Sequence, residues 1–111
     1  MNVTLPATTL PAKLPGEAVT VLFDFSSETT AVSVATTTSA LYTPVHADAA
    51  PSAMISGGAT VSGTNPAQVL QRIAGGLADN DYLILCSATA ANGDTLICPA
   101  ILPVRNAKTA S

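Results

Sequence analysis

Charge is scarce in this chain, and the shortage excludes several classes of partner. Charged residues make up 10% of the 111 residues, against roughly 25% in an ordinary soluble domain. The net charge is −3, with four basic residues, too few to neutralise a track of phosphates. We therefore expect no binding of nucleic acid and no attraction to a membrane. A weakly charged surface also resists association poorly, so we expect a protein partner to cover much of it. The alternative is a neutral monomer rich in Ala and Thr.

Residues that carry chemistry are equally scarce, since the chain has one His and two Cys. None of these has the spacing of metal ligands. His46 lies near Asp48 without a recognisable nucleophile, so we expect a loop histidine in water rather than a catalytic base. Asp79 and Asp81 flank Asn80 but lack the glycine and distal Glu of an EF-hand, and turn chemistry is the expected role. We predict that the protein is not an enzyme and has no cofactor, metal or small-molecule substrate.

Long apolar runs are absent as well. No stretch approaches the ~20 apolar residues that span a bilayer, and the first residues lack the basic and apolar regions of a signal peptide. We expect synthesis and solubility in a cytosol, with later departure as part of a larger assembly. The length of 111 residues suits one domain.

The clearest pattern that is present is a β-hairpin between residues 77 and 104. Apolar residues alternate before and after Asn92-Gly93, which is a strong hairpin signal. The strand that begins at Tyr82 has Ile84, Cys86 and Ala88 on the same face. Leu77 precedes Tyr82 by five residues, the spacing of a tyrosine corner, in which the ring is buried and the hydroxyl bonds to nearby backbone. The alternative is a core tyrosine after an ordinary loop.

The length of the hairpin loop determines which residue lies opposite Cys86. A two-residue loop would place Cys86 opposite Pro99. A three-residue loop, 91–93, with Gly93 in a left-handed conformation places Cys86 opposite Cys98. We predict the second arrangement with two buried free thiols, because free Cys behaves as a small hydrophobe. A disulfide is the alternative, and its geometry is demanding.

The other strands are short and are separated by Gly, Pro and Asn. The first is 17–25, with Phe23 among its inward residues. The next alternates weakly over 31–38, with Val32 and Val34 inward, and ends at Leu41-Tyr42. Two further strands are predicted on either side of Gly57-Gly58. Residues 67–73 fit a strand or one helical turn, and the flanking Pro and Gly favour a strand. About seven strands at 8–12-residue spacing predict an all-β fold, a single Ig-like or jelly-roll β-sandwich over residues 16–111 that ends in a short polar tail.

Residues 1–15 are predicted to form an extended arm outside this sandwich. Leu-Pro recurs three times, and each Pro holds the preceding Leu in an extended conformation. The arm would present apolar side chains to a partner, and the candidate contact residues are Leu5, Pro6, Leu10, Pro11 and Leu14. The alternative is a frayed terminus.

Several short sequences together resemble a known family. They are Pro15-Gly16-Glu17, Phe23-Asp24-Phe25-Ser26-Ser27, the stretch 51–57, Gly75-Gly76-Leu77 before Tyr82, and the hairpin that ends in Leu102-Pro103-Val104. In this order they resemble the small capsid staple, or decoration, proteins of epsilon-fifteen-like short-tailed phages. A related Ig-like pattern occurs in phage fibre–tail adaptor proteins.

The resemblance implies a virion structural protein made in the host cytoplasm and located on the outer capsid surface. It implies binding to neighbouring major capsid protein subunits, pairing as a homodimer at local two-fold axes, and no cofactor. The alternatives are a fibre–tail adaptor and an Ig-like module that binds carbohydrate or a receptor. A module that binds carbohydrate usually needs exposed aromatic rings. This chain has two Tyr, two Phe and no Trp, which makes that alternative the less favoured one.

Overall fold

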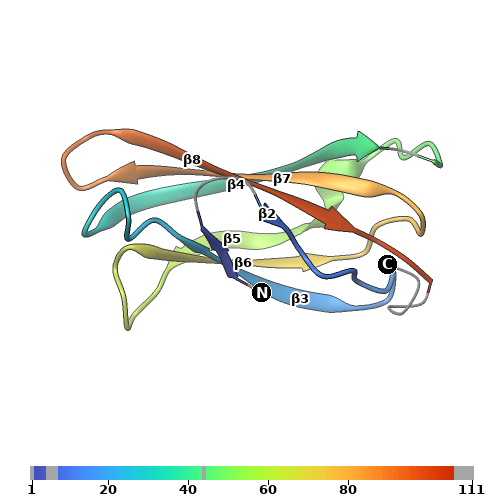
Figure 1. Ribbon diagram of the computed structural model, residues 1–111, viewed down its shortest axis with the longest axis horizontal. Coiled ribbons are helices and arrows are strands. Elements are labelled where there is room, and N and C mark those ends of the chain that lie inside the picture. Colours follow the sequence, from blue (N-terminus) through green and yellow to red (C-terminus); the bar gives the residue numbers. More distant parts are fainter. Residues whose placement is uncertain (1, 5–7, 44, 107–111) are drawn as a thin grey trace.

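The computed structural model describes residues 2–4, 8–43 and 45–106 and confirms an all-β sandwich of two four-stranded sheets (Figure 1). The first sheet has the order β1 (Asn2–Thr4), β3 (Ala18–Asp24), β6 (Gln68–Ala74) and β5 (Ile55–Val61). The second has the order β2 (Thr8–Thr9), β8 (Thr95–Pro103), β7 (Asp81–Ala90) and β4 (Val32–Thr43). A short 3-10 helix, η1 (Pro51–Met54), precedes β5. Strands β1 and β2 run parallel to β3 and β8, and the other pairings are antiparallel.

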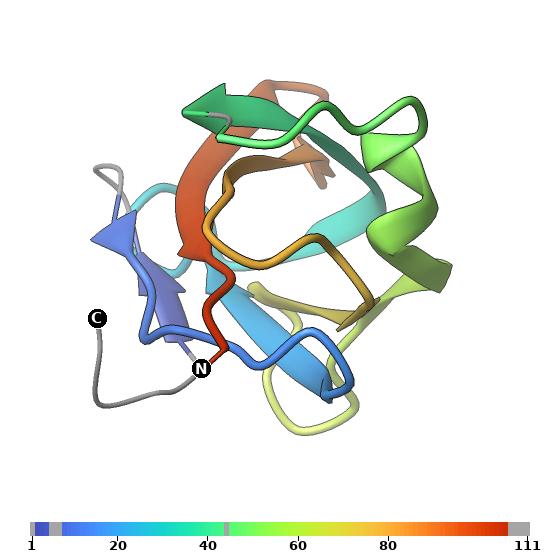
Figure 2. The same cartoon turned by 90° about the vertical axis from the view of Figure 1, so that its right-hand side faces the viewer.

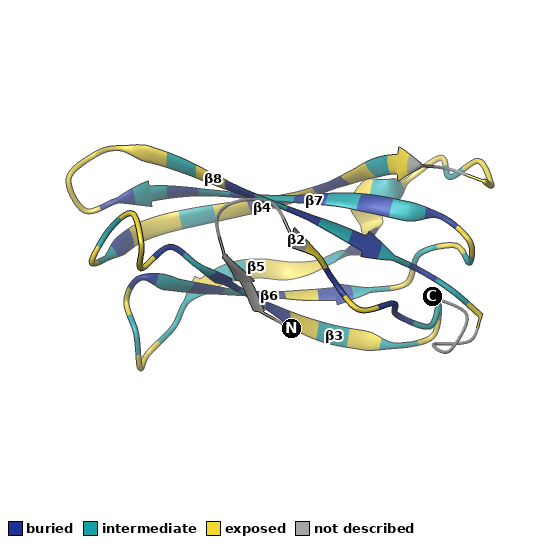
Figure 3. Cartoon of the chain, in the orientation of Figure 1, coloured by how far each residue is buried: buried dark blue, intermediate teal, exposed yellow. Residues whose placement is uncertain are grey.

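The core lies between the sheets and uses the inward positions predicted from alternation. Buried and half-buried residues follow one another along the whole of β7 (Figure 3). Phe23 and Tyr82 are both 0% exposed. Strand β6 is confirmed in place of a helical turn, with Val69, Gln71 and Ile73 all buried. The period of two in the sequence therefore reflects burial on one face of each strand.

The hairpin has the predicted loop. Cys86 lies opposite Cys98, and both are buried and free. The Ala90 N–H donates to the Asp94 carbonyl at 2.8 Å, which leaves residues 91–93 as the loop, and Gly93 has a φ of +96°. A left-handed residue at this position is the bulge that lets a three-residue loop match the twist of the strands.

Strand β4 differs from the prediction in one face. It extends to Thr43, close to the predicted end at Leu41-Tyr42, but Val34 is 58% exposed rather than inward. The register shifts between Val32 and Val34, and one extra residue in a strand moves all later side chains to the other face. The inward positions are therefore Thr37 and Ser39, both buried.

The two strands predicted around Gly57-Gly58 are one strand, β5, with an irregular register between Ser56 and Thr60. The buried Gln71 of β6 bonds to this irregular stretch. Its side-chain amide donates to the Ser56 carbonyl at 3.3 Å and to the Gly57 carbonyl at 3.1 Å. A side chain thus supplies hydrogen bonds where the ladder between β5 and β6 is irregular.

The prediction that residues 1–15 lie outside the sandwich is wrong for residues 2–4, which form β1 beside β3, and for the segment 8–13. This segment is extended, as predicted, but it pairs with β8 at the side of the sandwich (Figure 2). The Leu10 N–H donates to the Ile101 carbonyl at 2.8 Å and the Lys13 N–H to the Pro103 carbonyl at 3.0 Å. Pro11 lies between these two donors, so its missing N–H removes no bond from the ladder.

Candidate interaction face and polar end of the sandwich

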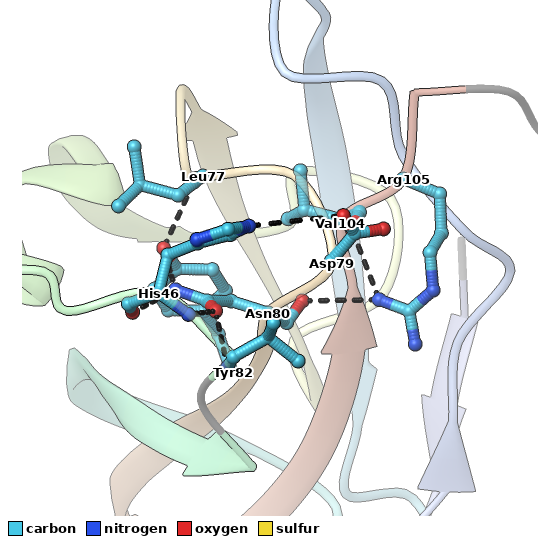
Figure 4. Close-up of polar contacts among 8 residues, drawn as sticks. His46, Leu77, Asp79, Asn80, Tyr82, Val104 and Arg105 are labelled. Atoms are coloured by element: carbon cyan, nitrogen blue, oxygen red, sulfur yellow. Dashed lines mark hydrogen bonds and ion pairs between the residues drawn. The ribbon is translucent and has the colours of Figure 1, made fainter.

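The predicted tyrosine corner is present at one end of the sandwich (Figure 4). The Leu77 N–H donates to the Tyr82 hydroxyl at 2.9 Å. The same hydroxyl donates to Asp48 Oδ2 at 2.8 Å, so the ring is held in the core while its polar end joins two loops. The bond to Asp48 was not predicted, because 34 residues separate the partners and only the fold brings them together.

Asn80 joins three segments at the same end, and sequence reasoning assigned it no more than a place in a turn. Its side chain is buried. The Oδ1 atom accepts the N–H groups of Val45 and His46, both at 2.8 Å, and Nδ2 donates to the His46 carbonyl at 2.9 Å. The Val104 N–H donates to the Asn80 carbonyl at 2.9 Å. An amide offers donors and an acceptor together, so one side chain holds the loop after β4 against the loop before β7.

The charged groups around this cluster lie in two close pairs. His46 Nε2 lies 3.8 Å from Asp79 Oδ2, and both side chains are more than half exposed. Asp81 pairs with Arg105 at 2.7 Å. Within residues 2–4, 8–43 and 45–106 there is no group of three or more His, Cys, Asp or Glu side chains that could hold a metal.

A cavity of about 290 Å³ adjoins this end, with Asp48, Met54, Gly76 and Leu77 among its walls. Its volume is at the lower limit for a small-molecule site. Asp48 is the one titratable residue that lines it, and that carboxylate already accepts the Tyr82 hydroxyl. The cavity thus adds space but no reactive group.

Two further kinds of reactive side chain are buried away from solvent. Burial raises the pKa of both Cys86 and Cys98 to about 11, which keeps the thiols protonated and unreactive at neutral pH. Lys13 is 0% exposed, and its ammonium donates to the carbonyls of Leu14 at 2.7 Å and Gly75 at 2.5 Å. Burial lowers the pKa of Lys13, with Glu17 opposing the shift. Neither environment admits a substrate, so these groups are structural.

The outer face of the β2–β8–β7–β4 sheet is the least charged surface among the described strands. Asp81 is the sole charged residue in these four strands, and it is paired with Arg105. The other sheet, by contrast, carries Asp24 and Arg72. We call this uncharged surface the neutral face, and its apolar members are half-buried or exposed: Val34, Leu83, Leu85, Ile97, Pro99 and Ile101.

The apolar side chains of the neutral face lie in neighbouring cross-strand positions. Leu83 is opposite Ile101, and Leu85 is opposite Pro99. Ile97, one pair further along, is 54% exposed. The adjacent part of β4 adds Thr36 and other small residues without charge. A continuous apolar area bordered by hydroxyls is typical of a protein–protein contact.

The five contact residues predicted in the arm do not form this surface. Leu10 is 4% exposed and belongs to the core, so its assignment as a partner contact is wrong. Pro11 is exposed and Leu14 half-buried. Leu5 and Pro6 lie outside the described residues. The signal for the neutral face was present in the sequence, in the charge-free runs of β4 and β8, but both faces of these strands are apolar or hydroxylated and the exposed one is not marked.

Comparisons of the chain with family models, with curated protein sequences and with solved structures found no match. The described part of the chain contains no helix with the length and hydropathy needed to cross a bilayer.

Proposed function

We propose that this protein is a non-enzymatic structural protein of a phage virion, made in the host cytoplasm, which binds the outer surface of the assembled capsid. It would hold neighbouring major capsid protein subunits together and pair at local two-fold axes. The observation that carries the proposal is the neutral face, an apolar sheet surface whose strands carry a single charged residue, Asp81, which is already paired with Arg105. The resemblance to capsid staple proteins suggests the partner, which is the assembled capsid of a phage.

The energetics of such a surface favour docking to a fixed protein partner. Each large apolar side chain that becomes buried contributes about 1.5–3 kcal/mol before ordering costs. Strand residues are already ordered, so docking immobilises little that was mobile. Burying a charge without a partner is expensive, and Ile97, Pro99 and Ile101 lie on a strand that has none.

Stabilisation of the particle follows from linkage. A protein that binds the assembled shell, but not its separated subunits, shifts the equilibrium toward the shell. Many identical contacts at fixed geometry make modest affinities effective. Because the contact is apolar and uncharged, binding should change little with ionic strength, unlike a contact between oppositely charged surfaces.

Charge placed on the neutral face tests the proposal. We expect Ile97→Lys to remove most binding to particles that lack the protein, because the ammonium would lose its water on docking. Thr60→Lys is the matched control, since Thr60 is exposed on the other sheet. Occupancy and heat resistance of the particles are the measurements. Equal occupancy by the two variants would exclude the neutral face as the contact, and binding at the tail alone, seen by electron microscopy, would favour a fibre–tail adaptor.

A further inference from the structure

The N-terminal segment 8–14 lies along the edge of β8. It fills a site on the sandwich that we call the seat. Leu10 enters the core at 4% exposure. The segment runs parallel to β8, with Thr8 opposite Ala100, Thr9 opposite Ile101 and an isolated bridge further along at Lys13. The Arg105 N–H donates back to the Lys13 carbonyl at 2.9 Å.

The seat itself is built by the rest of the chain. Its acceptors are the carbonyls of Ile101 and Pro103, which take the backbone N–H groups of the segment, and the carbonyl of Gly75, which takes the Lys13 ammonium. Without the segment, these groups and the edge of β8 would have no protein partner, and the site of Leu10 would be an apolar gap. Unpaired backbone groups at a sheet edge attract another strand.

The connection between the segment and the sandwich is short and closed by two bonds. The Glu17 N–H donates to the Leu14 carbonyl at 3.0 Å, and the Leu14 N–H donates to Glu17 Oε1 at 2.9 Å. Pro15 favours an extended Leu14, and Gly16 is exposed, with open space where a Cβ would be. Opening this turn would leave the contacts of the segment itself unchanged, which is what exchange of an element between two copies requires.

We propose that segment 8–14 exchanges between two copies of this chain, so that each copy seats the segment of the other beside β8. Exchange opens the turn at residues 14–17 and carries with it β1, which precedes the segment in the chain and pairs with β3. Every other contact is re-formed with identical atoms of the second chain, which makes exchange a route to a dimer at low free-energy cost. The partner copy then contributes Leu10 to the core and Lys13 to the Gly75 carbonyl. This inference does not depend on the function proposed above.

The segment that enters the seat in trans is that of a second copy, because the side chains that the seat binds have a particular spacing. The seat requires an apolar side chain at the position of Leu10 and a long cationic side chain three residues later, on a parallel segment that places Thr9 opposite Ile101 and Lys13 opposite Val104. The residue after Leu10 is Pro11, which has no backbone N–H to donate, and the seat requires no donor at that position. The chain itself carries this sequence, and in the same register.

Cross-linking between two tagged chains tests the exchange. Thr9 is exposed and lies opposite half-buried Ile101 on the neutral face. Thr9→Cys on a chain with one affinity tag and Ile101→Cys on a chain with another would be produced together in one cell and purified through both tags. A short bismaleimide would then join them, because the native Cys86 and Cys98 are buried and only the introduced thiols are accessible.

The expected result is a covalent species that carries both tags, at least ten times more abundant than in a control pair. The control joins Thr9→Cys with Ile97→Cys, four residues away along β8 or about 13 Å, so a dimer formed elsewhere on the surface does not favour the first pair. Equal cross-linking of the two pairs would overturn the proposal, and so would failure of the two tags to purify together.

Discussion

Removal of the Tyr82 hydroxyl isolates the contribution of the tyrosine corner to stability. Phe fills the space of the buried ring, so Tyr82→Phe leaves the core packing in place and removes only polar contacts. The hydroxyl accepts the Leu77 N–H at 2.9 Å and donates to Asp48 Oδ2 at 2.8 Å. Loss of a neutral bond costs about 0.5–1.5 kcal/mol and loss of a bond to a charged group about 1.5–3 kcal/mol. We expect a fall of about 2–4 kcal/mol in the free energy of unfolding.

Urea unfolding measures this loss directly, since a small domain commonly unfolds in a two-state manner. The midpoint should fall by about 1–2 M without a change in slope. Tyr42→Phe is the matched control, because Tyr42 is 54% exposed and surface changes usually remain within about 0.5 kcal/mol. A loss below about 0.5 kcal/mol in Tyr82→Phe would refute the reasoning.

A double-mutant cycle separates the bond to Asp48 from the two bonds that the hydroxyl accepts, from the Leu77 N–H and, at 3.4 Å, from Asn80 Nδ2. Asp48→Ala also removes the bond from the Ala50 N–H, and the cycle cancels that contribution. We expect a coupling of about 1–2 kcal/mol between Tyr82→Phe and Asp48→Ala, within the range of directly bonded side chains. A coupling near zero would mean that the bond to Asp48 does not stabilise the corner.

Three further predictions concern the core, the thiols and one glycine. Phe23→Ala should lower the free energy of unfolding by about 3–5 kcal/mol in the same urea assay, because Phe23 is fully buried; a loss below about 1 kcal/mol would contradict its place in the core. The free energy of unfolding should fall as pH rises from 9 to 11, by about 2–3 kcal/mol for each thiol, since Cys86 and Cys98 keep their protons to about pH 11 in the folded state while unfolded thiols lose theirs nearer pH 9; replacing both cysteines by Ala should remove this fall. Gly76→Ala should be less stable than wild type by more than Gly63→Ala, because Gly76 has a φ of +94° and an added Cβ would lie 3.0 Å from the Val104 side chain, which thermal unfolding of the two variants would compare.

The hairpin could be predicted in detail from local sequence because its determinants are local. The loop length, the left-handed Gly93 and the register of Cys86 with Cys98 all follow from a few adjacent residues. The same holds for the tyrosine corner, whose donor is only five residues from Tyr82. In each case the residues that decide the structure are neighbours in the chain.

The N-terminal segment shows where such reasoning fails. Three Leu-Pro pairs correctly predict an extended conformation, but an extended conformation does not determine whether the segment lies on a partner or on its own sandwich. Leu10 is buried because β8 offers an edge in the right register, which is a property of the fold. Lys13 was unassigned for the same reason, since the carbonyl that receives its ammonium is 62 residues away.

The face of β4 could not be predicted because a bulge has no strong signal in a run of Ser, Thr and Val. The register shift between Val32 and Val34 reverses the alternation for the rest of the strand. Hydroxylated residues are tolerated on either face of a sheet, so composition did not reveal the reversal. The inward Thr37 and the exposed Val34 are therefore findings of the structure.

Strand β4 also determines how the protein behaves before it meets a partner. It forms one edge of its sheet, is 12 residues long and contains no charged residue that would repel an approaching strand. Its register shifts lie near its two ends, so the stretch between Val34 and Leu41 is regular. Charged side chains commonly protect sheet edges from edge-to-edge association, and the scarcity of charge in this chain leaves the β4 edge without that protection.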